Sequence, residues 1–244
     1  MAAGIDTVWT RDEEAAAGPQ PLSREAIVRA AIEIADADGL DAVSIRRLAT
    51  KLDARPMSLY SHIGRKGDLI DLMVDEVMGG AIIPGGPPTD NWRGALRQIA
   101  QRTRESTRAH PWMIAAAFHR PHLGPNMLRH IDQSLAAVSE LPLSPERKRA
   151  VLLAVDTYTL GFVRWEVMSP KAKSKGPCAD AGPSAAEIDA YITAQAASGD
   201  YPYLAEFVGK KMGLSVNAEK FEIGLEWLLA GIEAEVGGAK GGGG

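Results

Sequence analysis

The chain has 244 residues, a formal net charge of −4 and 45% apolar side chains, which suits one large or two modest domains with a proper core. Its single cysteine, Cys178, excludes a disulfide framework and a cysteine-based zinc site. Because no apolar run approaches the roughly 20 residues of a membrane span, and no basic-then-apolar leader opens the chain, we expect a cytoplasmic protein with no membrane partner.

The N-terminal part of the chain predicts an arm followed by a small helical domain. Residues 1–21 are rich in Ala, Gly, Pro and acidic residues and show no helical periodicity, so we expect a flexible arm. Apolar residues at helical spacing then occupy 23–37, which ends at Gly39, and 67–78. With two shorter helices between them, these segments form a predicted domain over residues 22–80.

The two short helices lie within residues 44–66 and surround a tight turn. The first can begin at Ser44, whose hydroxyl can accept a bond from a free amide of the first turn. The second begins near Pro56, whose fixed φ suits a first helical turn. Asp53 is the only acidic residue of this segment. DNA affinity comes largely from neutralising phosphates, so the segment predicts a DNA-docking surface with six basic residues, namely Arg46, Arg47, Lys51, Arg55, Arg65 and Lys66.

Residues 23–77 resemble the N-terminal domain of tetracycline-repressor-like (TetR-family) transcriptional regulators. The resemblance is carried by G-L-D-A-x-S-x-R-x-L-A from Gly39, by L-Y-x-H at 59–62, and by K-x-D-L-x-D-x-M from Lys66. It implies that the L-Y-x-H helix enters the major groove, with an arginine of the preceding helix reading a base and a lysine at the fourth helix gripping phosphate. One departure is Asp53, where the family often has glycine. The expected DNA-contacting residues are Ser44, Arg46, Arg47, Arg55, Met57, Ser58, Tyr60, His62 and Lys66.

The remainder of the chain predicts a second helical domain over residues 90–236. The Gly- and Pro-rich segment 79–90 must interrupt the helix before it, 170–183 is expected to be a loop, and 237–244 is expected to be a flexible tail. No segment shows sustained period-two alternation, so the expected fold is all-α, with an N-terminal three-helix helix-turn-helix domain and a helical effector-binding and dimerisation domain. Helices are expected at 91–109, 112–118, 125–141, 144–168 and 218–236.

Two of these helices carry more apolar surface than one core requires. The helix from Ser144 is apolar over most of its circumference, and the last helix places Gly224 and Gly231 where a neighbouring helix can approach closely. The family resemblance implies a homodimer formed through a four-helix bundle of such helices. The alternative is that both helices only complete a monomeric core. The expected interface residues are Val151, Val155, Leu225, Leu228 and Ile232.

The family resemblance also implies a pocket for a small-molecule effector in the second domain. Large apolar side chains with a few polar groups are typical of such sites, and those available favour an apolar or aromatic ligand. A zinc site at His119 and His122 is disfavoured because Pro121 interrupts the helix between them, and no cofactor is expected. The candidate pocket residues are Trp92, Trp112, Met113, Phe118, His119, Asn126, Met127, Tyr158, Phe162 and Trp165.

Two other functional classes remain as alternatives. A helical enzyme is disfavoured because the chain has no Gly-rich phosphate loop, nucleophile elbow or His-Glu-x-x-His motif. A ligand-binding sensor without operator binding would require the basic segment to be incidental. We therefore expect a homodimeric, ligand-responsive transcriptional regulator, most simply a repressor, that is not an enzyme, binds a palindromic double-stranded DNA operator and is released by a small-molecule effector.

Overall fold

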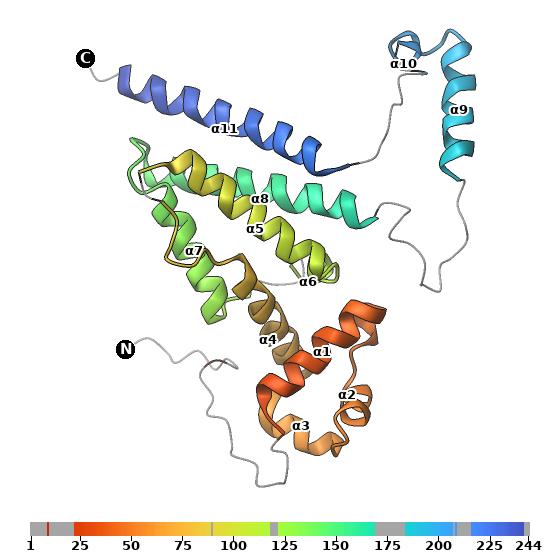
Figure 1. Ribbon diagram of the computed structural model, residues 1–244, viewed down its shortest axis with the longest axis vertical. Coiled ribbons are helices and arrows are strands. Elements are labelled where there is room, and N and C mark those ends of the chain that lie inside the picture. Colours follow the sequence, from red (N-terminus) through yellow and green to blue (C-terminus); the bar gives the residue numbers. More distant parts are fainter. Residues whose placement is uncertain are drawn as a thin grey trace.

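The computed structural model describes residues 9, 22–88, 90–117, 122–168, 184–206, 208 and 216–241. These residues form helices and connecting turns, with no strand among them, so the all-α prediction is confirmed. Figure 1 shows a small unit of helices α1 to α3 at one end and a bundle of longer helices at the other, with α4 between them. We call the first unit, residues 22–81 with α4, the reading end, and the second unit, which begins with the helix at residue 92, the bundle end.

The reading end consists of short elements with clear start and stop signals. Ser44 accepts a hydrogen bond from the Arg47 amide at 3.3 Å and so caps its helix as expected. Ser23 caps α1 in the same way, accepting from the Ala26 amide at 3.2 Å. Pro56 is the first residue of its helix. Asp53 adopts a left-handed φ of 49°, the conformation that the glycine of related sequences would suit. The elements are α1 (Arg24–Asp38), η1 (Leu40–Ala42), α2 (Ile45–Lys51), α3 (Pro56–Ile63), α4 (Lys66–Met78) and η2 (Gly79–Ala81).

The core of the reading end continues into the bundle end. Ile27, Leu48, Leu59, Ile63 and Leu69 are fully buried and pack in one cluster. The same cluster includes buried residues near the start of the second domain, Trp112, Met113 and Ala116. Trp9, the one described residue of the predicted arm, also packs against it. Because both ends contribute to one apolar core, a displacement of the bundle end also shifts the packing of helices α1 to α4.

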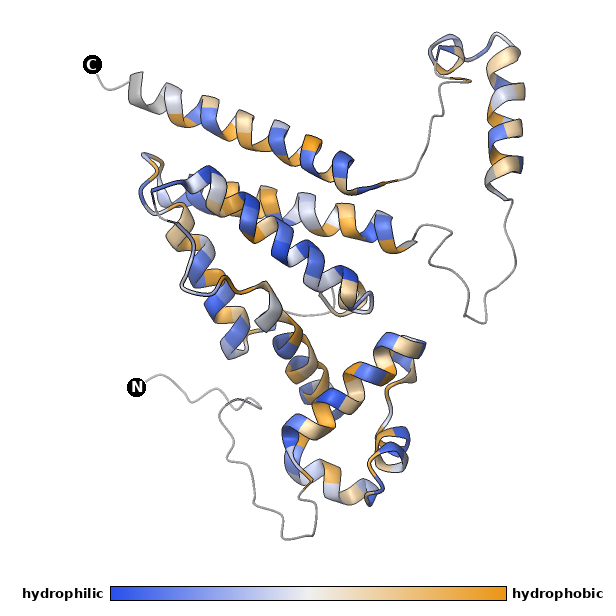
Figure 2. Cartoon of the chain, in the orientation of Figure 1, coloured by the Kyte–Doolittle hydropathy of each residue, from blue (hydrophilic) through white to orange (hydrophobic). Residues whose placement is uncertain are grey.

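The bundle end is built around α5 (Trp92–Ala109) and α8 (Pro145–Met168), which pack against each other, and α11 (Ala218–Gly241) packs against α8. Its apolar core is formed by Leu96, Ile99, Phe221, Leu225 and Leu229, and orange and blue bands alternate along α5 and α11 in Figure 2. The remaining elements are α6 (Met113–Ala117), α7 (Pro125–Ala137), α9 (Ala185–Ala197) and α10 (Pro202–Ala205).

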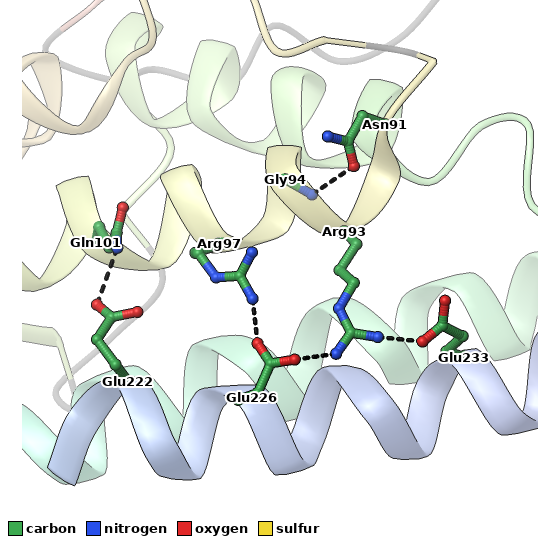
Figure 3. Close-up of polar contacts among 8 residues, drawn as sticks. All are labelled: Asn91, Arg93, Gly94, Arg97, Gln101, Glu222, Glu226 and Glu233. Carbon is green, nitrogen blue, oxygen red and sulfur yellow. Dashed lines mark hydrogen bonds and ion pairs between the residues drawn. The ribbon is translucent and has the colours of Figure 1, made fainter. Parts of the chain in front are cut away.

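Polar contacts fix α11 against α5 on the side away from this core. Arg93 pairs with Glu226 and Glu233, and Arg97 pairs with the other carboxylate oxygen of Glu226 (Figure 3). The Arg93 hydrogen bond, together with that of Arg97, lowers the pKa of Glu226. Gln101 donates to Glu222 at 2.9 Å one turn further along. These contacts set the rotation of α11 and therefore decide which of its residues face outward.

The predicted helices are present, and the structure differs from the prediction in the following elements. The helix α7 ends at Ala137 and not at residue 141, and α9 and α10 were not predicted. The helix α11 continues to Gly241, so the prediction that residues 237–244 form a flexible tail was wrong for 237–241. The predicted loop at 170–183 lies outside the described residues.

Candidate DNA-binding face and effector site

Helix α3 presents an exposed face that is held by two buried anchors. Leu59 and Ile63 are fully buried, four residues apart, and fix the rotation of this short helix. On the opposite side Met57 is 77% exposed, Tyr60 is 43% exposed, and Ser58 is also exposed. A single short helix can therefore offer an apolar, an aromatic and a hydroxyl group to a partner at once.

Three basic side chains surround this exposed face. Arg46 on α2, Arg55 at the start of α3 and Lys66 at the start of α4 are exposed, and none of them has an ion-pair or hydrogen-bond partner among the described residues. Such side chains are free to meet phosphates or base edges without first breaking a contact. Arg46, Arg55, Met57, Ser58, Tyr60 and Lys66 thus lie where DNA could reach them.

The other three expected DNA-contacting residues have local roles. The Ser44 hydroxyl caps α2, and Arg47 pairs with Asp38 at the end of α1. Both side chains remain exposed. His62 is only 3% exposed, and its carbonyl oxygen accepts a 3.0 Å bond from Nε of Arg24. The expectation that His62 contacts DNA was wrong, because its position beside Leu59 and Ile63 turns it into the core.

Three carboxylates of the reading end contact the segment that runs from residue 110 through α6 to the first turn of α7. Asp36 on α1 accepts from Nε1 of Trp112 at 2.8 Å, and Nδ1 of His110 lies 2.8 Å from the same oxygen. On α4, Asp71 is 2.7 Å from Nδ1 of His122. Also on α4, Asp75 accepts from the backbone amides of Asn126 and Met127 at 3.2 and 2.9 Å. We call this set the carboxylate link.

Several expected pocket residues belong to this junction. Asn126 and Met127 open α7 and bind Asp75, while Trp112 and Met113 are buried against α1 and α4. These four residues therefore connect the two ends of the molecule, and none of them lines either of the two cavities described below. Phe118 and His119 lie outside the described residues.

The remaining expected pocket residues lie on α5 and α8, and two of them contact Phe221 of α11. Tyr158 stacks on Phe221 with ring centroids 5.5 Å apart, and Phe162 meets the same ring edge-on at 5.2 Å. The Tyr158 hydroxyl donates to the Phe221 carbonyl at 2.7 Å. Burial raises the pKa of Tyr158. Trp92 is half-buried against the same core. Trp165 is 67% exposed, so the expectation that it lines an internal pocket was wrong.

The expected interface residues mostly lie inside the protomer. Val151, Val155, Leu225 and Ile232 are buried in the bundle core, and Leu228 is half-buried against it. One protomer already covers the four buried side chains, so their assignment to a dimer interface was wrong, whereas the assignment of Leu228 stays a prediction. The large exposed apolar residues of α8 and α11 are instead Leu153, Trp165, Ile223 and Trp227, with Trp227 75% exposed.

Two cavities of similar volume differ in the chemistry of their walls. One of about 570 Å³ lies between α1, α4 and α5, and charged residues of both signs line it, including Glu33, Glu76 and Arg102. The other, of about 620 Å³, lies between α7 and α8 and is lined mainly by apolar side chains around Asp156. The apolar walls and small polar set of this second cavity are typical of a small-molecule site. The sequence alone does not predict the cavity between α7 and α8, because the apolar residues of a groove wall have the same helical spacing as core residues.

The described part of the chain contains no group of three or more His, Cys, Asp or Glu side chains that could hold a metal ion. His122 is engaged by Asp71 and by the Ala116 carbonyl. No helix in the described ranges is both long enough and apolar enough to cross a membrane.

Residues 84–236 match the tetracyclin repressor-like C-terminal domain family. The chain is 30% identical over 237 residues to the HTH-type transcriptional repressor DrrR1 of Streptomyces coeruleorubidus, and the matched region covers 97% of this chain and 87% of DrrR1. It is 32% identical over 232 residues to an HTH-type transcriptional regulator of Saccharopolyspora erythraea, covering 94% and 92%. The structure of the Streptomyces coelicolor TetR family protein ActR in complex with actinorhodin matches with a TM-score of 0.74 at 28% identity, over 89% of this chain and 100% of that one. The chain therefore belongs to the TetR family of helix-turn-helix transcriptional regulators.

Proposed function

We propose that this regulator is a homodimeric repressor that binds an inverted-repeat operator and is released by a small apolar or aromatic effector. The exposed face of α3, flanked by Arg46, Arg55 and Lys66, carries the proposal. Its side chains suit a major groove, and the three cations suit the phosphates on either side. The named repressor DrrR1 supports repression, and ActR, which has been crystallised with actinorhodin, supports a small-molecule effector.

A dimer is supported by an exposed face shared by α8 and α11. Thr157, Gly161 and Trp165 are exposed at intervals of four residues on α8, as are Ile223, Trp227 and Gly231 on α11. A Cβ at Gly161 or Gly231 would meet nothing within 4 Å inside the protomer, so neither glycine is required by packing within one chain. Glycines beside exposed tryptophans let a second pair of helices approach and receive the indole rings. We call these six residues the outer face.

Release requires that the effector domain influence the separation of two α3 helices. The carboxylate link supplies the connection, because α1 and α4 bear carboxylates that hold the segment around α6 and the first turn of α7. An effector that binds the spread form more tightly moves the equilibrium towards release. A 100-fold preference corresponds to roughly 2.7 kcal/mol.

The proposal is tested by selecting bound fragments from the source genome and measuring the mass of the resulting complexes. The expected result is an inverted repeat bound by an even number of protomers, since two-fold protein symmetry is matched by a two-fold site. Selection of fragments with no shared sequence would contradict operator binding and would favour a sensor that does not read DNA.

A further inference from the structure

The groove between α7 and α8 is apolar along both walls. Ile131 and Leu135 of α7 form one wall, and Leu152 and Leu153 of α8 form the other. Ile131, Leu135 and Leu153 are between 40% and 68% exposed, so their apolar surface is not covered by the protomer. With a volume of about 620 Å³ the groove has room for a fused-ring compound.

A single carboxylate in the groove lacks a partner. Asp156 is half-buried, and the described residues give it no hydrogen bond or ion pair. The other charged residues that line the groove, Glu146 and Arg149, face each other at 3.9 Å and offset one another. Asp156 therefore leaves an uncompensated negative charge when it is ionised. Its burial, which raises the pKa to about 6, still leaves it mostly ionised at neutral pH.

The neighbouring histidine does not neutralise this charge. The Oε1 atom of Gln133 accepts a 2.9 Å bond from the Ile83 amide, which leaves the Gln133 amide nitrogen as the donor to Nδ1 of His130 at 3.2 Å. The neutral ring then carries its proton on Nε2. Burial lowers the pKa of His130, which keeps the ring neutral. No described group that lines the groove pairs with Asp156, so a cationic ligand would supply the counter-charge that this carboxylate lacks.

We propose that the α7–α8 groove binds the effector, and that this effector combines an apolar aromatic body with a protonated amine that pairs with Asp156. The aromatic body lies between the leucine and isoleucine walls, and the ammonium group donates to the carboxylate. The inference rests on the proposed ligand-responsive function, and it specifies the chemical class of the ligand and the place where it binds.

The groove is joined to the helix that carries the reading end. Gln133, which contacts the groove residue His130, donates to the Ala81 carbonyl at 3.1 Å and accepts from the Ile83 amide. Ala81 ends the η2 turn that follows α4, and Ile83 comes just after it. The first turn of the same α7 is bound to Asp75 of α4. A ligand that rotates or shifts α7 against α8 therefore acts on α4 at two points.

A series of three naphthalene compounds tests the proposal directly. The protonated 1-naphthylmethylamine, the neutral 1-naphthylmethanol and the anionic 1-naphthylacetate share one aromatic body and differ in charge. Their binding to the full-length protein is measured by calorimetry without DNA, at a pH where Asp156 is ionised. The amine is expected to bind about tenfold more tightly than the alcohol, and the carboxylate most weakly.

Two variants separate the charge of Asp156 from general effects. In Asp156→Asn the preference for the amine over the alcohol should disappear, while alcohol binding is retained. Asp132→Asn removes an exposed carboxylate of α7 that does not line the groove, and should keep the preference. For the wild type, amine affinity should fall as the pH is lowered through about 6, because Asp156 gains a proton.

Binding of the amine at Asp156 and release of the operator are measured by separate experiments, so each can fail without the other. Equal binding of amine and alcohol, no amine binding, or a preference that persists in Asp156→Asn would each overturn the cation site. Release of operator is measured separately by fluorescence anisotropy with the amine present. An amine that binds through Asp156 yet leaves operator affinity unchanged would support the site and contradict its role as the effector switch.

Discussion

The carboxylate of Asp75 on α4 accepts a 2.9 Å hydrogen bond from the backbone amide of Met127 in the first turn of α7. Its second oxygen accepts from the Asn126 amide at 3.2 Å, and the Asp75 side chain is only 3% exposed. A carboxylate at a helix N-terminus satisfies unpaired amides and meets the positive end of the helix dipole. Helix α4 thus provides the cap of α7, which forms one wall of the α7–α8 groove.

Replacing Asp75 by alanine should uncouple α4 from α7. Two partly buried amides would lose their acceptor, so the free energy of unfolding should fall by about 1–3 kcal/mol, measured by urea denaturation. Glu76→Ala changes the adjacent, exposed carboxylate and is the matched control, with little expected effect. Equal losses in the two variants would show that the Asp75 contacts do not stabilise the fold.

Gly124 provides an independent check on the same contact. A Cβ built there would lie 2.3 Å from an Asp75 oxygen, so Gly124→Ala must displace the carboxylate or the start of α7. We expect a loss of stability and a weaker response of operator binding to effector, measured by denaturation and anisotropy. Gly237→Ala, where a Cβ meets nothing within 4 Å and which is not part of the outer face, serves as the control for stability. Wild-type behaviour of Gly124→Ala would contradict the close approach.

Arg46 and Lys66 should differ in how their loss affects DNA binding. If Arg46 reaches a guanine edge, as its position in the family motif implies, Arg46→Ala should lose roughly 1–3 kcal/mol per half-site and relax preference at one base pair. Lys66→Ala should weaken binding to all duplexes and reduce the salt dependence, because an ammonium group meets phosphate without reading sequence. Anisotropy with operator and single-base variants distinguishes them, and a sequence-selective loss in Lys66→Ala would contradict its role.

Trp227→Glu should dissociate the proposed dimer. The indole ring is 75% exposed in the protomer and lies on the outer face, so a carboxylate there would be buried only on association. Light scattering should report a folded monomer with weakened operator binding. Tyr191→Glu, on an exposed residue of α9, is the control and should remain dimeric. A dimeric Trp227→Glu protein that binds operator normally would place the interface elsewhere.

The stability of the protein should depend on pH through Asp156. Burial raises the pKa of this carboxyl group from an ordinary 3.8 to about 6, so the folded protein holds the proton more tightly than the unfolded chain. The resulting stabilisation is complete below about pH 3.8 and is lost as the pH rises through about 6. At neutral pH Asp156→Asn should therefore unfold with a free energy about 1–3 kcal/mol higher than wild type, and the difference should vanish near pH 4. Denaturation at several pH values measures it, and a difference that does not change with pH would contradict the assignment.

The helices could be predicted where the signals are local. Ser44 and Pro56 start their helices as the sequence indicates, because capping and a fixed φ depend on neighbouring residues alone. The prediction failed where the outcome depends on packing between helices. His62 and Val155 occupy positions that sequence spacing leaves open, and the rotation of α3 and α8 against their neighbours turned both side chains inward. The groove at Asp156 could not be predicted either, because it is formed only when α7 and α8 come together.

The most direct test of operator recognition is the ratio of affinities for the selected inverted repeat and for a shuffled duplex of the same composition. Fluorescence anisotropy at two salt concentrations gives both affinities with the wild-type protein. We predict a preference of about 10³-fold or more for the inverted repeat, with binding to both duplexes weakening as salt rises. Equal affinity for the two duplexes, or binding that does not respond to salt, would contradict the account of α2 and α3 as the DNA-reading face.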